Sequence, residues 1–285
     1  MTRAEIPAWA PHPDVWLVVA ALVAGYAVAV VRLGPRLAPD RDMPVSRLQQ
    51  CALGAAALAI LLASDWPIHD VAERYLFSVH MLQHFLYATV VAPLLLIATP
   101  AWMARAMLGS GRALRVLRVA ARFLPATLLF NVVLVGTHLP AVVDHAVRNA
   151  AIHFLIHAIV LLSALVVWLP ILSPLPEIPR FYAPVGMAFL FLQSVLPTIP
   201  AAWLSYNEHV LYRVYERFDR LWGVSALSDM RMAGVAMKSA TGGVLWIVIA
   251  IVFFRWYETE EPSRQSRRRN QKLEPSAHGL SEQVS

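Results

Sequence analysis

Charged side chains are scarce in this sequence, and cysteine is almost absent. Asp, Glu, Lys and Arg make up 15% of the 285 residues, and Cys51 is the single cysteine. One cysteine excludes an internal disulfide, a CxxC redox pair and a thiolate-based metal site within one chain. The sequence also has no Gly-rich nucleotide-binding loop, no G-x-S-x-G and no H-E-x-x-H. It therefore gives no support to chemistry driven by ATP or by a serine nucleophile.

The residues that are present are mainly apolar. Hydrophobic residues make up 58% of the chain, the mean hydropathy is +0.57, and there are nine tryptophans. This composition indicates an integral membrane protein whose surroundings are the lipid bilayer. The net charge of +6 does not indicate a nucleic-acid partner, because the arginines gather in short stretches between apolar runs, as orientation signals do. The first 14 residues lack a basic n-region, so we expect no signal peptide.

Seven stretches approach the roughly 20 apolar residues that a helix needs to cross the hydrocarbon core. They are residues 15–34, 47–64, 76–99, 123–143, 151–172, 182–205 and 230–256. The second is short, and a proline interrupts the fourth, "FLPATLLFNVVLVGTHLPAVV". The sequence therefore predicts an all-α polytopic bundle of about seven transmembrane helices, which form one domain over residues 1–257.

The basic residues predict how the bundle is oriented. If the seven spans alternate in direction, sixteen of the 24 Lys and Arg residues fall on one side and seven on the other, with Lys238 inside the last span. The positive-inside rule then places the N-terminus outside and the C-terminus in the cytoplasm. Residues 258–285 are polar and basic and contain no aromatic residue, so we expect a disordered cytoplasmic tail.

Histidines gather at the predicted outer level of the bundle. His80 and His84 open the third span, and His153 and His157 open the fifth. Each pair has i, i+4 spacing, which puts both rings on one face of a helix, where they can clasp one metal ion. The same level also receives His138 and His145 from the fourth span and Asp229, Met230, Met232 and Met237 from the seventh.

A lone histidine in an apolar segment is more often a hydrogen-bonded structural residue than a ligand, and a lone methionine usually packs. Clustering favours a metal or cofactor site, because polar groups inside a bilayer are costly unless they are satisfied. An interhelical hydrogen-bond network is the alternative. Imidazole with thioether favours copper, especially Cu(I), whereas imidazole with carboxylate favours zinc. The predicted ligand set is His80, His84, His153, His157, Met81, His138, Asp229 and Met237.

Four segments together resemble the seven-span family of caa3-type cytochrome c oxidase assembly factors, the bacterial CtaG family. They are "HMLQHFLYATVVAPLLLIATPAW", the "HLP" at 138–140, "HFLIHAIVLLSALVVWLPIL" and the final "SDMRMAGVAMK" with its "GGVLW", and the similarity covers about residues 15–257. In many relatives the last motif runs Asp-Gln, a small pair and Met-Trp. Here it runs Asp229-Met230, Ala233-Gly234 and Met237-Lys238, so Asp229 and Met237 keep their family positions.

The resemblance implies a multi-pass protein of the bacterial plasma membrane that helps to build a haem-copper oxidase by handling copper on the outer side. His80, His84, His153 and His157 would be its central positions, oxidase subunits its partners, and the protein would not be an enzyme. Two alternatives from other classes stay open. One is a seven-span zinc hydrolase, although the last span lacks the expected histidine pair. The other is a single-haem b-type cytochrome with axial histidines from the third and fifth spans. A transporter ranks fourth.

Overall fold

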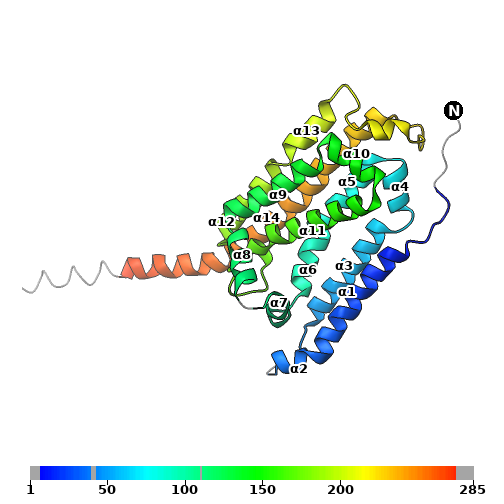
Figure 1. The fold of residues 1–285 in the computed structure, drawn as a ribbon. Coiled ribbons are helices and arrows are strands. Elements are labelled where there is room, and N and C mark those ends of the chain that lie inside the picture. Colours follow the sequence, from blue (N-terminus) through cyan, green and yellow to red (C-terminus); the bar gives the residue numbers. More distant parts are fainter. Residues whose placement is uncertain (1–6, 40–42, 110, 274–285) are drawn as a thin grey trace, which may run out of the picture.

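The protein is a bundle of long helices whose axes lie roughly along one common line, with the chain passing up and down the bundle (Figure 1). The computed structural model describes residues 7–39, 43–109 and 111–273, with side chains described up to residue 260. Over these ranges the chain is 79% helix and has no strand, which confirms the all-α prediction. The elements are α1 Pro13–Arg32, α2 Gly34–Leu37, α3 Arg47–Ser64, α4 Ile68–Arg74, α5 Phe77–Leu86, η1 Tyr87–Val91, α6 Ala92–Ala98, α7 Ala101–Leu108, α8 Arg112–Ala120, α9 Phe123–Thr137, α10 Pro140–Arg148, α11 Ala150–Leu172, α12 Ala183–Val195, α13 Thr198–Tyr206, η2 Arg213–Arg217 and α14 Ala226–Leu273.

Six helical segments in the described part of the chain are long and apolar enough to cross a membrane. They are Pro13–Arg32, Arg47–Ser64, Phe77–Ala98, Ala150–Leu172, Ala183–Tyr206 and Ala226–Glu260. Each matches a predicted span. In α1 only 6% of the most apolar window is buried, and Leu17, Val28 and Val31 are exposed, which is the pattern of a helix that presents its apolar side chains to lipid.

The fourth predicted span, residues 123–143, is shorter than expected. Helix α9 ends at Thr137 after 15 residues, and Leu139 adopts an extended conformation before Pro140 begins α10. A residue that precedes proline is pushed out of the helical region, which explains the early end. Helices α8 and α9 form a pair bent by 83°, and the number of spans becomes seven if this pair counts as one.

Prolines also interrupt two other spans. Helices α5 and α6 are separated by the π-helix η1, in which the Ala92 N–H bonds to the Tyr87 carbonyl five residues back. Pro93 follows directly and has no N–H to give to the helix, and a local shift to π bonding is a common response. In the sixth span, α12 ends before Pro197 and α13 begins after it. The Lys238 ammonium donates to the freed Ser194 carbonyl at 2.7 Å, which satisfies the intramembrane charge.

Helix α14 is the longest element and packs against α5, α12 and α13. At Gly234 a Cβ would meet the Ser205 side chain and the Ala201 carbonyl, so only glycine permits this approach to α13. The helix continues to Leu273, whereas the sequence predicted a disordered tail from residue 258. Glu, Arg, Gln and Lys are good helix formers, and extending an existing helix needs no new nucleation. The predicted tail residues 274–285 lie outside the described residues.

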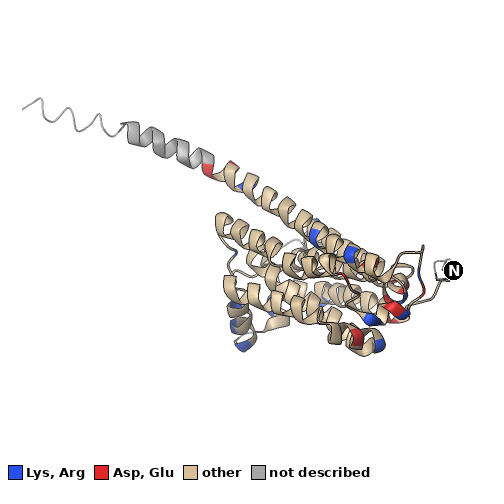
Figure 2. Cartoon of the chain, turned by 90° about the horizontal axis from the view of Figure 1, so that it is seen from above, with Lys and Arg blue, Asp and Glu red and all other residues tan. Residues whose placement is uncertain are grey.

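The two ends of the bundle differ in charge. Helix α8 carries several arginines at one end, while Asp and Glu gather mainly at the end that holds the N-terminus (Figure 2). Helices α4 and α10 and the residue 207–225 loop lie at this second end (Figure 1). The loop turns inward, with the Tyr212 and Tyr215 side chains buried. The histidines from α5 and α11 lie below it.

Candidate metal centre

The histidine pairs of α5 and α11 converge, whereas their spacing predicted only that each pair shares one face of its helix. The ring centroid of His80 lies 5.1 Å from that of His153 and 5.4 Å from that of His157. The ring centroids of His84 and His157 are 4.7 Å apart. Within the pairs the centroids are 4.6 Å apart on α5 and 4.4 Å apart on α11. Two segments about 70 residues apart in sequence therefore place four imidazoles in one cluster.

Three of these imidazoles form a group that could hold one metal ion. One ring nitrogen from each of His80, His84 and His157 lies within 4.8 Å of the other two. Metal–nitrogen bonds of about 2.0–2.1 Å hold imidazole nitrogens about 3.4 Å apart in a tetrahedral site.

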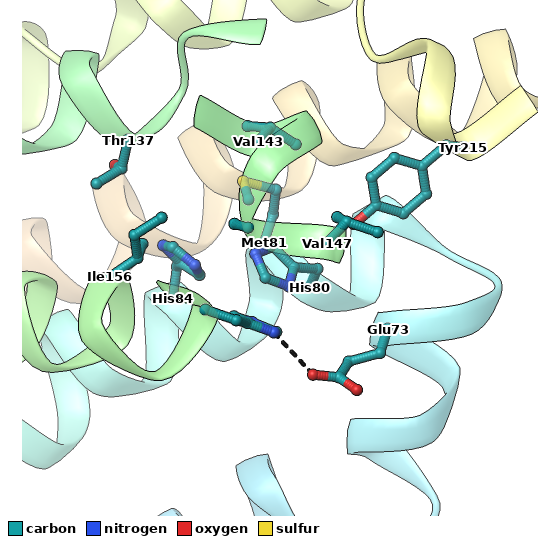
Figure 3. A pocket seen from close by; sticks show the side chains of 11 residues that line it. Glu73, His80, Met81, His84, Thr137, Val143, Val147, Ile156 and Tyr215 are labelled. Atoms are coloured by element: carbon teal, nitrogen blue, oxygen red, sulfur yellow. Dashed lines mark ion pairs between the residues drawn. The ribbon is translucent and has the colours of Figure 1, made fainter. Parts of the chain in front are cut away.

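Three ring nitrogens of His80 and His84 lack hydrogen-bond partners within the described chain. His84 is buried, and neither its Nδ1 nor its Nε2 has a hydrogen-bond partner; His80 Nδ1 is unpartnered as well. Each such atom costs about 1–3 kcal/mol of unmet hydrogen bonding. His80 and His84 line a cavity of about 30 Å³ together with Glu73, Met81 and His153 (Figure 3). That volume holds one water or one ion.

His153 takes a different place from the other three. Its Nδ1 lies 2.7 Å from Glu73 Oε1, and its Nε2 lies 2.9 Å from His157 Nε2. A carboxylate can only accept, so Nδ1 carries the hydrogen and the Nε2 of neutral His153 is an acceptor. His157 must then donate from Nε2, which leaves its Nδ1 lone pair free. The Glu73 carboxylate thus orients the histidine cluster from α4.

A thioether and a fifth imidazole flank His84 on its other side. His138 Nδ1 donates to the Leu134 carbonyl at 2.6 Å, and His138 Nε2 lies 3.2 Å from Met81 Sδ. Because the carbonyl takes the ring hydrogen, the lone pair of Nε2 faces the lone pairs of sulfur. His84, Met81, His138 and Met237 line a second cavity of about 40 Å³. Three predicted residues besides the histidine pairs are therefore beside the cluster.

Asp229, the eighth predicted ligand, is engaged elsewhere. Its carboxylate accepts from the backbone N–H of Phe77 at 2.6 Å and of Ser78 at 3.1 Å, and also from the Ser78 hydroxyl. These are the first orphan donors of α5, so Asp229 caps the helix that carries His80 and His84. In this structure Asp229 positions the start of α5.

The sequence analysis missed Glu73 and His69, which both lie on α4 outside the membrane spans. Their i, i+4 spacing in "HDVAER" is the signal that was available. Burial lowers the pKa of His69. Burial raises the pKa of Glu73, but the hydrogen bond from His153 and the charges of His69 and Arg74 outweigh it, so the pKa ends below its ordinary value. Glu73 is therefore ionised at neutral pH.

The comparisons with known proteins agree with this architecture. Residues 24–259 match the family model described as cytochrome c oxidase caa3 assembly factor. No curated protein and no solved structure gives a match. The family match begins inside α1, extends into α14 and includes all eight predicted site residues. The chain therefore belongs to the cytochrome c oxidase caa3 assembly factor family.

Proposed function

We propose that this assembly factor binds one copper ion in the His80–His84–His157 group and delivers it to a subunit of the haem-copper oxidase. One observation carries the proposal: His84 is buried with both ring nitrogens unpartnered, and His80 and His157 each bring a ring nitrogen within 4.8 Å of one of its nitrogens and of each other. A hydrogen-bond network would satisfy these atoms internally, whereas a metal site leaves them to its ion.

The donor set favours Cu(I) over zinc. A thioether is a soft ligand that suits Cu(I), and zinc prefers imidazole with carboxylate or thiolate. The 3.2 Å separation of Met81 Sδ and His138 Nε2 suits two neighbouring ligands of one ion, with bonds of about 2.0 Å to nitrogen and 2.3 Å to sulfur. The carboxylate nearest to the group, Glu73, is already bonded to His153. A cavity of about 30 Å³ also suits an ion and is far smaller than a porphyrin.

His84 belongs to two neighbouring groups of possible ligands, and this arrangement supports delivery of copper as well as its storage. His84 borders both the cavity of the histidine group and the cavity of Met81, His138 and Met237. An ion can exchange one imidazole for a neighbouring thioether without leaving the site, so no step requires a naked ion in an apolar medium. Copper is the cargo here, and the role is assembly without catalysis.

The proposed location is the bacterial plasma membrane, with the copper site near its outer face. The distribution of Lys and Arg favours a cytoplasmic C-terminus, and α5, which carries His80 and His84, lies toward the opposite end of the bundle from the arginine-rich α8 (Figure 1). The client oxidase subunit would then receive the ion on the outer side.

Copper binding by the purified full chain tests the proposal. Reconstituted protein should bind one Cu(I) per chain, and the double variant His80→Ala/His84→Ala should bind none. His145→Ala/His209→Ala is the matched control, because it removes two exposed histidines from the same end of the bundle. Equal stoichiometry in the two double variants would refute the copper site. In cells that depend on this protein, the first variant should yield oxidase with less copper and the control should not.

A further inference from the structure

Helix α8 turns away from α9 at the arginine-rich end of the bundle. The two helices are bent by 83° relative to each other, and only Ala121 and Arg122 separate them. Helix α9 packs along α11 (Figure 1), which is long and apolar enough to cross a membrane. Spanning helices are tilted by about 20° on average from the bilayer normal, so the bend directs α8 along the membrane surface.

The residues around this bend carry charge of one sign. Residues 101–125 contain five arginines and no Asp or Glu. Arg112, Arg115 and Arg118 follow one another at intervals of three on α8, which puts them on one side of the helix, and Arg122 follows at the bend. All four side chains are exposed. Such a helix cannot enter the hydrocarbon core, where arginine is costly.

The protein pairs only part of this charge. Glu177 accepts a hydrogen bond from Arg105 at 2.8 Å with its carboxylate, and its backbone carbonyl accepts one from Arg118 at 2.7 Å. Within the described residues, no carboxylate lies in ion-pair distance of Arg112, Arg115 or Arg122. These three guanidinium groups are therefore available to an anionic partner.

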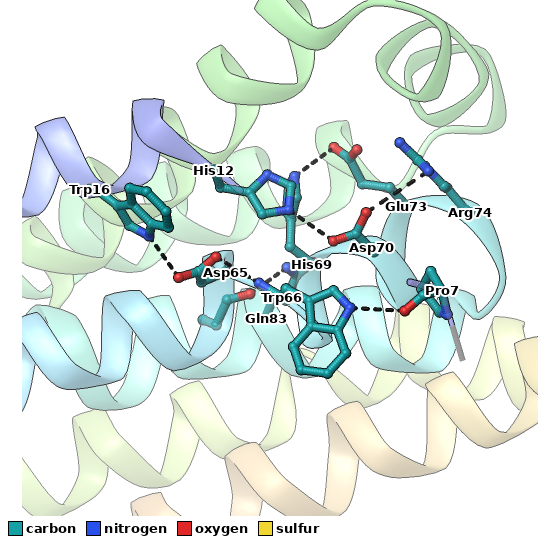
Figure 4. Close-up of polar contacts among 11 residues, drawn as sticks. Pro7, His12, Trp16, Asp65, Trp66, His69, Asp70, Glu73, Arg74 and Gln83 are labelled. Atoms are coloured by element: carbon teal, nitrogen blue, oxygen red, sulfur yellow. Dashed lines mark hydrogen bonds and ion pairs between the residues drawn. The ribbon is translucent and has the colours of Figure 1, made fainter. Parts of the chain in front are cut away.

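The opposite end of the bundle carries both signs of charge. The residue 207–225 loop contains three arginines and three acidic residues. Asp70 lies 2.8 Å from His12 Nε2, and Asp65 accepts a hydrogen bond from Trp16 Nε1 at 2.8 Å (Figure 4). Positive and negative groups are mixed there, whereas the α8 end presents an uninterrupted basic surface.

Apolar side chains lie beside the arginines of α8. Leu114 and Leu117 pack against the buried cluster that contains Leu169 at the end of α11, which fixes the helix on the bundle. Val116 and Val119 are 68% and 49% exposed. A basic helix with exposed aliphatic side chains suits the membrane interface, where headgroup phosphates meet acyl chains.

We propose that α8 is an interfacial helix whose arginines Arg112, Arg115 and Arg122 bind anionic phospholipids. Each guanidinium can donate two parallel hydrogen bonds to a phosphate, and each arginine near an anionic membrane surface strengthens binding about fivefold. A soluble acidic protein would match the charge but would leave the exposed valines without acyl chains to cover them. The surface lies at the other end of the bundle from His80 and His84 (Figure 1), so the proposal does not depend on copper binding.

Lipid binding by the delipidated full chain in detergent tests the surface. Native mass spectrometry counts bound phosphatidylglycerol, with phosphatidylcholine as the lipid without net charge. Phosphatidylglycerol should bind more tightly, and Arg112→Gln/Arg115→Gln should weaken its tightest binding about 25-fold, which is fivefold for each arginine. Arg213→Gln/Arg217→Gln is the matched control, because it removes the same charge from two exposed arginines in the mixed-charge loop. It should leave the affinity unchanged.

A nitroxide on α8 measures whether the helix touches the bilayer. The label is attached through Val116→Cys in a Cys51→Ser background, and the protein is placed in phosphatidylglycerol nanodiscs. Its collisions with oxygen should exceed those with a water-soluble nickel chelate, whereas a label attached through Glu208→Cys, an exposed position in the residue 207–225 loop, should show the reverse.

Three results would overturn the proposal. They are equal affinity for the two lipids, equal affinity of the two double variants for phosphatidylglycerol, and a label at residue 116 as open to the nickel chelate as the label at residue 208. Displacement of phosphatidylglycerol by millimolar inorganic phosphate would also overturn it, because the arginines would then recognise a free anion. Thermal unfolding of each variant verifies that the fold is intact.

Discussion

Replacing Glu73 by Gln removes one charge from the site and little else. The amide can still accept the hydrogen bond from His153 Nδ1, which the carboxylate now accepts at 2.7 Å. Hydrogen bonds to a charged group contribute about 1.5–3 kcal/mol, against about 0.5–1.5 kcal/mol for neutral partners. Since Glu73 is 34% exposed and solvent screens part of this difference, we expect a loss of about 1 kcal/mol or slightly more.

A loss of this size predicts Cu(I) affinity about five- to tenfold lower, at or just below the lower limit of the 10–100-fold loss that is typical when the carboxylate partner of a ligating histidine is removed. Glu73→Ala should weaken binding further, because no acceptor then fixes the tautomer of His153, and His157 can no longer be held with Nδ1 free. The affinities are measured by competition with a coloured Cu(I) chelator at pH 7.

Glu177→Gln provides the matched control, because Glu177 also accepts a hydrogen bond from a basic side chain, Arg105 at 2.8 Å, but lies away from the histidines. This control should bind Cu(I) like the unmodified protein. If Glu73→Gln and Glu73→Ala both keep full affinity, the carboxylate does not orient the cluster, and the assignment of the His153 and His157 tautomers is wrong.

Three further predictions concern stability and follow from single contacts. Asp229→Ala removes the acceptor for the first turn of α5 and should lower the free energy of unfolding by about 2 kcal/mol or more; thermal melts should show a loss that exposed Asp219→Ala does not. Lys238→Met leaves the Ser194 carbonyl without its donor and should cost about 1–3 kcal/mol while Cu(I) affinity stays the same, so a loss of copper would contradict a purely structural role. The hydrogen bond from Arg105 lowers the pKa of Glu177 below its ordinary value of 4.5. The stabilisation it provides is complete above pH 4.5 and is lost as the pH falls through the lowered pKa, so the difference in melting temperature between the unmodified protein and Glu177→Gln should shrink on acidification; a constant difference would refute the contact.

Residue spacing predicted which histidines share a helix face, because helices convert spacing into geometry. The pairs His80/His84 and His153/His157 each share a helix face by their i, i+4 separation alone, and both open spans that run in the same direction, so they lie at the same end of the bundle. Met81, His138 and Met237 were placed at the same level by the same argument, and the structure brings them beside His84. The metal itself stays a prediction.

Asp229 shows where this reasoning fails. The sequence placed it near the start of the last span, but a position along a helix does not say which neighbour receives the carboxylate. The N–H groups at the start of α5 have no acceptor within the helix, and they bind the Asp229 carboxylate. Only the packing of α14 against α5 shows that these groups are its neighbours. The fourth span illustrates a similar limit, because Pro140 ends α9 earlier than hydropathy alone indicates.

Hydropathy and the distances between histidines were enough to determine an all-helical membrane bundle with a histidine-rich end, because both depend only on local periodicity and on the length needed to cross a bilayer. The tertiary structure decided the contacts of α4 and of the N-terminal segment. Short polar elements have no hydrophobic periodicity from which their contacts could be predicted. The contacts of Glu73 with His153 and of His12 with Asp70 depend on how the chain folds back over the histidine-rich end of the bundle. The identity of the groups that orient the histidines is thus a property of the fold.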